Sequence, residues 1–224
     1  ALFRKLTRGL IESQMGIVWT THMRFEKSLL DEQVWQDAKE SGCKYLHFGY
    51  ESGVERVLQL MDKATTTEIM TKHLQLTANA GIWNHCMGFF GFPGETKEEA
   101  WQSVQFLEQN KGHVHSLGFG TFDLGRHNPV AKYPDKWGVT AYKNPDLDLA
   151  LDYYYTVKNG MSIEEAERVF EQFERHHNPG WDLRLYIREY IFLYISKFGL
   201  EKLPDLQYQA IKTAGVTPTL AGKM

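Results

Sequence analysis

Apolar and polar positions follow two different periods along the first 125 residues. LFRKLTRGLIES (2–13) has apolar residues at helical spacing, and IVWTTHMRF (17–25) then switches to the β-branched and aromatic pattern of a strand. The same alternation predicts strands over 43–50, 82–92 and 114–124, and helices over 29–41, 54–61, 65–80 and 97–110. Four strands separated by helices indicate an α/β fold with a parallel sheet and right-handed crossovers.

Helix starts carry a recognisable signal. In a capping box, a Ser or Thr side chain accepts a bond from the backbone three residues later, and an acidic side chain returns the bond. Pairs with this spacing are Ser28 with Asp31, Ser52 with Glu55, Thr96 with Glu99, and Ser162 with Glu165. We expect each pair to open a helix.

The pattern changes after residue 125. Residues 126–145 hold three prolines and predict a long irregular segment. Beyond them the pattern is helical, over 163–177 and over 181–198, where apolar residues cover most of the circumference and predict a buried helix. We therefore divide the chain into an α/β part, 1–125, and an irregular linker with a helical extension, 126–224.

Composition and charge narrow the function classes. The formal net charge is −3 and charged residues are spread along the chain, so no basic stripe for nucleic acid is indicated. No apolar run is long enough for a membrane span, and residues 1–20 lack a signal-peptide pattern, so we expect a cytoplasmic protein. Cys43 and Cys86 are the only cysteines, too few for a disulfide framework or a four-cysteine metal site.

Polar or glycine-rich residues stand where the predicted strands end. In parallel α/β folds the functional face lies at the carboxyl ends of the strands. The four ends carry Thr20, His22 and Arg24 on one face of the first strand, Glu51 and Ser52 after the second, GFPGET (91–96) after the third, and Thr121 and Asp123 in the fourth. These positions are the candidate site.

Simpler roles compete for the charged and basic positions. Arg24 and Glu51 could form a structural ion pair. The strand histidines His22, His47 and His85 fit core or rim positions better than metal ligation, because no carboxylate or histidine at helical spacing completes a ligand set. Metal binding by these histidines is therefore a weak signal.

The GFPGET segment is more specific than the single residues. Two glycines and a proline at the end of a strand produce a tight turn that lets the backbone approach a flat ligand. It could equally be a plain strand-to-helix turn in which Thr96 caps the next helix. The two readings are compatible.

Taken together, these motifs match a known pattern. SGCKYLHFGYESGVERVLQLMDKATT, a helix, and then NAGIWNHCMGFFGFPGETKEEAWQSVQFL resemble the second half of the radical S-adenosylmethionine superfamily barrel. The similarity is greatest to the branch of methylthiotransferases and enzymes that carry a cobalamin-binding domain. WTTHMRFE also resembles the preceding strand of that branch, with its characteristic Arg24. The resemblance covers about residues 10–130.

The resemblance implies an incomplete parallel (βα) barrel, with about four of the six strands of the family. Its members bind a 4Fe-4S cluster through a CxxxCxxC loop and S-adenosylmethionine on that cluster. No CxxxCxxC occurs in this sequence. We expect either that the chain is the carboxyl-terminal part of a longer protein, with the cluster ligands outside it and a cobalamin domain possible, or that the cluster site has been lost. The chain alone should be inactive.

Residue roles follow from the resemblance as expectations. Glu51 corresponds to the residue that bonds the ribose or amino end of S-adenosylmethionine, and Lys63 to the residue that pairs with its carboxylate, although a solvated helix end would also explain Lys63. Other expected cofactor contacts are Arg24, Ser52, Gly91, Phe92, Pro93 and Gly94, with Thr20, His22, Thr121 and Asp123 facing a small-molecule or peptide substrate. The implied chemistry is reductive cleavage to a deoxyadenosyl radical, or methyl transfer.

Two other functions stay open. The chain could be a degenerate barrel that binds a nucleoside-like ligand or a protein without redox chemistry. It could, less directly, be a metal-dependent hydrolase using His22, Glu51 and Asp123. An open half-barrel also exposes the edge of its first strand, so a fragment must cover that edge or pair with a second copy.

Overall fold

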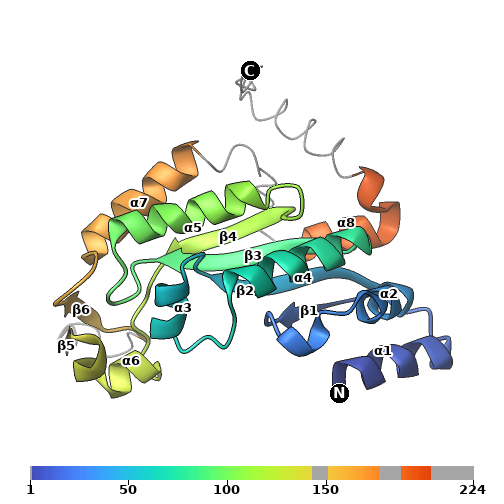
Figure 1. The fold of residues 1–224 in the computed structure, drawn as a ribbon, viewed down its shortest axis with the longest axis horizontal. Coiled ribbons are helices and arrows are strands. Elements are labelled where there is room, and N and C mark those ends of the chain that lie inside the picture. The colour runs from blue at the N-terminus through green and yellow to red at the C-terminus, as the bar shows by residue number, and fades with distance from the viewer. Residues whose placement is uncertain (1, 143–150, 177–187, 203–224) are drawn as a thin grey trace.

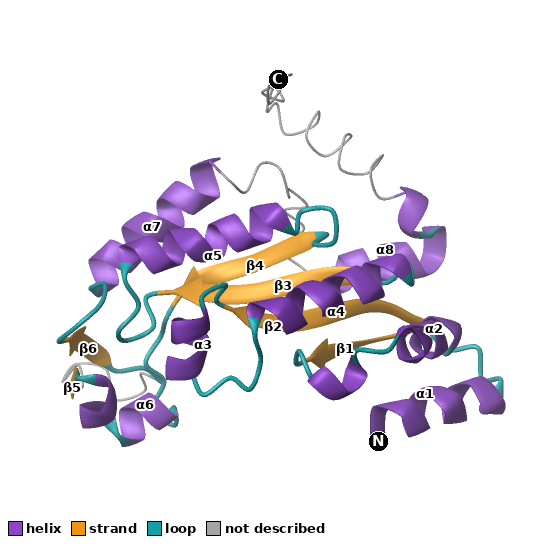
Figure 2. Cartoon of the chain, viewed as in Figure 1, coloured by secondary structure: helices purple, strands orange, loops and turns teal. Residues whose placement is uncertain are grey.

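The computed structural model describes residues 2–142, 151–176 and 188–202, and these form a parallel sheet with helices packed on it (Figure 1). Figure 2 shows the same arrangement by secondary structure. The strands are β1 (Trp19–Met23), β2 (Cys43–Glu51), β3 (Trp83–Phe90), β4 (Ser116–Thr121), β5 (Val139–Tyr142) and β6 (Tyr154–Val157). The α-helices are α1 (Leu2–Ser13), α2 (Glu32–Glu40), α3 (Glu55–Leu60), α4 (Thr67–Asn79), α5 (Lys97–Gln109), α6 (Pro129–Lys132), α7 (Ile163–His176) and α8 (Arg188–Phe198).

The main sheet has the order β1-β2-β3-β4, and all its neighbours are parallel. This confirms the α/β prediction, because each strand is reached through a helix from the previous one. The carboxyl ends of β2, β3 and β4 point toward the side where α3, α6, β5 and β6 lie (Figure 1). The candidate site is therefore bounded by these shorter elements.

One face of the sheet packs against helices to form the main core. Leu46, Phe48 and Tyr50 of β2 are fully buried there, together with Trp35 of α2 and Leu74 of α4. Burial of each such side chain stabilises the fold by about 1.5–3 kcal/mol. The alternate residues of the same strands face the opposite side, as the two-residue period of a strand requires.

The opposite face is covered by α8 near the amino ends of the strands. Ile191 and Ile195 of α8 pack on Tyr45 and Trp83. The expectation of a buried helix is met by Ile191 and Ile195 but not by Leu193, which is 58% exposed. The segment 181–187 lies outside the described residues.

The segment after β4 is more structured than its prolines suggested. Residues 126–142 contain α6, a 3-10 turn (Pro134–Trp137) and β5, which pairs antiparallel with β6. The prediction of an irregular linker is thus wrong there, since prolines at the first position of a short helix and of a 3-10 turn are compatible with both. The strand β6 also lies in a region where only helix was predicted.

The helix α7 joins the core of the main sheet. Val169 and Phe173 pack with Phe90 of β3 and with Val104 of α5. The extension therefore packs directly on the α/β part, and the division of the chain near residue 125 stays a prediction.

The capping predictions had mixed outcomes. Complete capping boxes are present at Thr96 with Glu99 and at Ser162 with Glu165. The other two are wrong: Asp31 itself is the N-cap of α2, and α3 begins after Val54, with the Glu55 carboxylate accepting bonds from Thr67. The carboxylate of Asp31 thus caps α2, whereas that of Glu55 binds the first residue of α4 rather than its own helix.

Both edges of the main sheet belong to strands with one neighbour, β1 and β4. The expected free edge of β1 is thus a feature of the described residues. No described helix is both long enough and apolar enough to cross a membrane.

Candidate functional site

The site starts with an unusual backbone conformation at the end of β2. Glu51 has φ +62°, a left-handed conformation that is uncommon for a residue other than glycine. It follows a β-bulge between Gly49 and Glu51, so the chain turns sharply there. A Cβ at Gly49 would lie 2.9 Å from Glu51 Oε1, so the glycine makes room for the carboxylate. Strained residues of this kind concentrate at functional sites.

The second element of the site is the end of α3. Lys63 N–H donates to Leu58 O at 2.9 Å and Asp62 N–H donates to Gln59 O at 3.0 Å, with Asp62 at φ +56°. These two bonds form a Schellman motif, which ends a helix with one left-handed residue. Aspartate tolerates this conformation better than most residues. The motif explains the MDK sequence: Asp62 turns the chain and directs Lys63 back toward the sheet.

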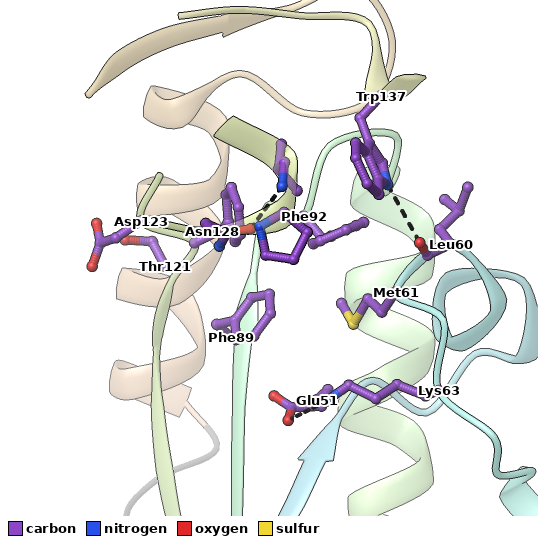
Figure 3. A pocket seen from close by; sticks show the side chains of 13 residues that line it. Glu51, Leu60, Met61, Lys63, Phe89, Phe92, Thr121, Asp123, Asn128 and Trp137 are labelled. Carbon is purple, nitrogen blue, oxygen red and sulfur yellow. Dashed lines mark hydrogen bonds and ion pairs between the residues drawn. The ribbon is translucent and has the colours of Figure 1, made fainter. Parts of the chain in front are cut away.

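The end of β2 and the end of α3 bring Glu51 and Lys63 into contact. Lys63 Nζ lies 2.9 Å from Glu51 Oε1, and Figure 3 shows the two side chains pointing toward one another. Their side chains are 40% and 18% exposed, so a ligand from solvent can reach both groups. The structure thus brings the acid and the amine together, while their contact with a cofactor stays a prediction. The alternative ion pair to Arg24 is not the one formed: Glu51 pairs with Lys63.

The ion pair lies at one end of a cavity of ≈ 450 Å³. Its wall is mostly apolar and is formed by Leu60, Met61, Phe89, Phe92, Phe122, Pro129, Val130 and Trp137. Trp137 Nε1 donates to Leu60 O at 3.4 Å, which ties the 3-10 turn to the end of α3 across the cavity (Figure 3). The cavity thus combines a charged end with aromatic walls, an arrangement suited to a ligand with one flat and one charged part.

Sequence reasoning found Phe92 but missed the other aromatic walls. Phe89 alternates with core residues on β3, and Trp137 lies in the segment predicted to be irregular. The strand period could have placed Phe89 on the cavity side. No pattern in the sequence indicated Trp137.

The GFPGET turn is held by a residue that sequence analysis also missed. Glu95 is 1% exposed, and its Oε2 accepts a bond from Gly91 N–H at 2.7 Å. Burial raises the pKa of this carboxyl to about 7, against the opposing effect of that bond. Gly91 has φ +87°, and a Cβ there would lie 2.5 Å from the Cβ of Ala166. The close approach that this glycine allows is therefore to α7.

Within the turn, only Phe92 is among the residues that line the cavity. Gly94 has φ +92°, its carbonyl accepts a bond from Arg56 at 2.7 Å, and its N–H donates to Asn159 O. Pro93 is buried. Cofactor contacts from Gly91, Pro93 and Gly94 stay predictions.

Ser52 is not among the residues that line the cavity. It is fully buried, and its hydroxyl lies 2.9 Å from the hydroxyl of Ser103 on α5. The same hydroxyl accepts a bond from Val54 N–H. The contacts of Ser52 in the structure are thus to α5 and to the turn before α3.

The expected residues of β1 are placed away from the ion pair. Thr20 and His22 align with Tyr45 and His47 of β2, and His22 is exposed. Arg24 is exposed just beyond the end of β1. None of the three lines the cavity.

Thr121 and Asp123, at the end of β4, do line the cavity. They lie at its far end from Lys63 (Figure 3). Burial and the neighbouring carboxylate of Asp152 raise the pKa of Asp123.

The strand histidines form a row across the sheet. The rings of His22 and His47 stack at 4.6 Å, and those of His47 and His85 meet edge to face at 5.5 Å. His85 Nδ1 lies 2.8 Å from the hydroxyl of Ser116. Among the described residues, no three or more His, Cys, Asp and Glu side chains are grouped to hold a metal ion. The hydrolase reading therefore lacks the grouped ligand set it needs.

The cysteines do not fit a cluster site. Cys43 and Cys86 are fully buried, and burial raises the pKa of both thiols, that of Cys43 to about 12. Cluster ligands are thiolates at a solvent-reachable loop. Neither cysteine lines the cavity.

Comparison with known proteins agrees with this geometry. Residues 5–107 match the Radical SAM superfamily. An uncharacterized methyltransferase of Pyrococcus horikoshii is 31% identical over 97 residues, which cover 42% of this chain and 20% of that protein. This chain thus spans about a fifth of that relative.

Two solved structures share the fold. The cobalamin-dependent S-adenosylmethionine radical enzyme OxsB has a TM-score of 0.60 and 15% identity, over 95% of this chain and 35% of that one. The radical S-adenosylmethionine methyltransferase TsrM from Kitasatospora setae, with tryptophan and an S-adenosylmethionine analogue bound, has a TM-score of 0.54 and 16% identity, over 63% and 30%. The four parallel strands and their helices are thus an incomplete barrel of this fold.

Proposed function

We propose that the cavity forms part of an S-adenosylmethionine site in a longer enzyme, because residues 5–107 match the Radical SAM superfamily. The observation that carries the proposal is the Glu51–Lys63 pair at the charged end of an aromatic cavity. An amino acid bound there offers an ammonium group for Glu51 and a carboxylate for Lys63, so it can replace the internal ion pair with two matched contacts.

The remaining walls suit the adenosyl part. Phe89, Phe92 and Phe122 present ring surfaces on which a flat adenine can pack. Trp137 and Met61 cover the side of the cavity near α3 and exclude water from the ligand. S-adenosylmethionine, when bound, supplies either a deoxyadenosyl radical or a methyl group; the protein residues bind, orient and enclose it.

The cluster is a separate matter, because the two cysteines of this chain do not fit it. We propose that cluster ligands, and a cobalamin-binding domain if present, belong to other parts of the parent protein. The residues of this chain then contribute cofactor binding and the surroundings of a small-molecule or peptide substrate.

Binding measurements on the 224-residue chain test the proposal. Titration with S-adenosylhomocysteine, which has the same amino acid and adenosyl parts, should show binding that weakens about tenfold in Glu51→Gln and in Lys63→Met, the loss of one charge-assisted contact. Glu98→Gln and Lys97→Met make the same changes on the exposed first turn of α5 and should bind as wild type. Equal binding by all four variants would remove the assignment.

A binding module without redox chemistry is the second candidate. It is favoured by one observation, that both cysteines are buried away from the cavity. The two proposals differ in the parent protein: iron content and deoxyadenosine production support the enzyme, whereas adenosyl binding without either supports the module.

Two further expectations belong to the same proposal. The free edge of β1 would be covered by another strand of the parent or by a second copy of the chain. Sedimentation of the chain at several concentrations distinguishes these, because only the second gives a dimer. A cytoplasmic location stays a prediction.

A further inference from the structure

A second cavity adjoins the first. It has a volume of ≈ 780 Å³ and is lined by residues at the end of β4, along β6 and in the first turns of α7. Thr121, Phe122 and Asp123 line both cavities. A molecule in the second cavity would therefore lie next to one in the first.

The lining of the second cavity is strongly one-sided in charge. Among the described residues it contains four carboxylates and no lysine, arginine or histidine. The four are Asp123, Asp152, Glu164 and Glu167. The first cavity differs, because its carboxylates are accompanied by Lys63. Negative charge in a partly enclosed space attracts cations and repels anions.

These carboxylates act on one another and on a buried tyrosine. Asp152 contributes to the raised pKa of Asp123, after burial. Burial is the main cause of the raised pKa of Tyr155, and Asp123 and Glu167 add to it; the Tyr155 hydroxyl donates to Phe122 O at 2.9 Å. Glu164 accepts a bond from the Ser162 hydroxyl and is also stabilised by the charge of Arg168, which is not part of the lining. The negative charge around Tyr155 thus lacks a counter-charge in the lining of the cavity.

The size of the cavity and the spread of the carboxylates limit the occupant. No three acidic side chains among the described residues come close enough to hold a metal ion. A cation that contacts several of these carboxylates at once must therefore be larger than a metal ion. Tyr153, Tyr154 and Tyr155 also line the cavity, and aromatic faces bind ammonium and guanidinium groups as well as the apolar stems that carry them.

We propose that this second cavity binds an organic cation, an ammonium or guanidinium group on an apolar stem, between β6 and α7. As the substrate site of a radical enzyme it rests on the function proposed above, since its position beside the first cavity places the cation next to the adenosyl ligand. The binding of a cation, in contrast, is inferred from the residues that line the second cavity and does not depend on that function.

The test uses the 224-residue chain and 1,4-diaminobutane as the probe, with 1,4-butanediol as its neutral control. We expect the diamine to bind and the diol not to bind by titration calorimetry, with affinity falling as salt is raised from about 20 to 200 mM, because screening weakens exposed charge interactions. A blocked lysine tripeptide in a parallel titration shows whether the cation is better presented by a peptide. Either ligand supports the site; binding of neither, or equal binding of the diol, overturns it.

Two variants place the binding in the cavity. Glu167→Gln and Asp152→Asn should each weaken diamine binding about tenfold, the effect of one charge-assisted contact. Both residues are exposed, so the fold should tolerate the changes. Glu12→Gln, on exposed α1, is the charge-matched control and should bind as wild type. If all three variants bind the diamine equally well, the diamine does not bind in this cavity and the proposal is refuted.

Failure here is separable from failure of the proposed function. S-adenosylhomocysteine titration reads the first cavity alone, and its result does not depend on the diamine. Normal adenosyl binding without diamine binding refutes the cation site and leaves the proposed function intact. Diamine binding without adenosyl binding supports the cation site and refutes the proposed function.

Discussion

Replacing Glu51 with glycine should leave the fold about as stable as it is, even though the change removes an ion pair. The pair with Lys63 is partly exposed, and such pairs contribute about 0.2–1 kcal/mol. The left-handed conformation of a non-glycine residue costs about 1–2 kcal/mol, which glycine does not incur. Glycine in turn lowers the free energy of unfolding by about 0.4–1 kcal/mol, because it gives the unfolded chain more conformational freedom.

These contributions nearly cancel, so the free energy of unfolding of Glu51→Gly should lie within about 1 kcal/mol of wild type. Glu51→Val also removes the carboxylate but keeps a left-handed conformation that a β-branched residue adopts poorly. The strain that valine keeps, less the loss that glycine brings through the unfolded chain, leaves Glu51→Val about 1 kcal/mol less stable than Glu51→Gly. Urea denaturation measures the difference directly.

A control position reverses the order. Gln105 is exposed in the middle of α5, where the backbone is right-handed. Glycine is a poorer helix former than valine, so Gln105→Gly should be slightly less stable than Gln105→Val. Equal stabilities of the two variants at Glu51 would refute the claim that the backbone there is strained. Both Glu51 variants should bind S-adenosylhomocysteine about tenfold more weakly than wild type, which separates the need for the carboxylate from the stability of the fold.

Three further changes test how the site is held. Gly49→Ala should displace the Glu51 carboxylate at little cost in stability, because the clash is with a movable side-chain end; weaker S-adenosylhomocysteine binding at an unchanged urea midpoint is the expected result. Asp62→Val should destabilise the turn that directs Lys63, by about 1 kcal/mol, whereas Asp62→Gly should not; equal urea midpoints would contradict this. The raised pKa of Glu95 means that wild type loses stability as pH rises from 4.5 through about 7, and Glu95→Gln should lack that loss in urea denaturation at pH 5 and 8.

The direction of the Glu95 effect follows from which state holds the proton more tightly. Its folded pKa lies above the unfolded value, so the folded protein binds the proton better between the two values. The stabilisation is complete below the unfolded pKa and disappears as pH rises through the folded one. A wild-type stability that instead rose relative to Glu95→Gln over this range would show that the carboxylate is better paired when ionised.

The sequence predicted the parallel sheet because each strand and helix carries its own period and its own end signal. The Glu51–Lys63 meeting could also be predicted, since both residues stand at the ends of adjacent elements that must return to the same edge of the sheet. The strand β6 could not, because its partner in the described residues is β5, which lies in a segment whose prolines suggest irregular structure. Trp137 belongs to the same segment and was missed for the same reason.

The contrast between Glu51 and Gly91 shows what local sequence cannot decide. Both positions have a left-handed backbone at a strand end, and both motifs suggested a ligand. The side chain of Glu51 faces a cavity, whereas the space beside Gly91 is filled by Ala166 of α7, a helix more than 70 residues later in the chain. A tight turn fixes where the backbone goes, but distant elements decide what comes close to it. For this reason the acidic second cavity, made where β4 meets β6 and α7, is visible only in the folded chain.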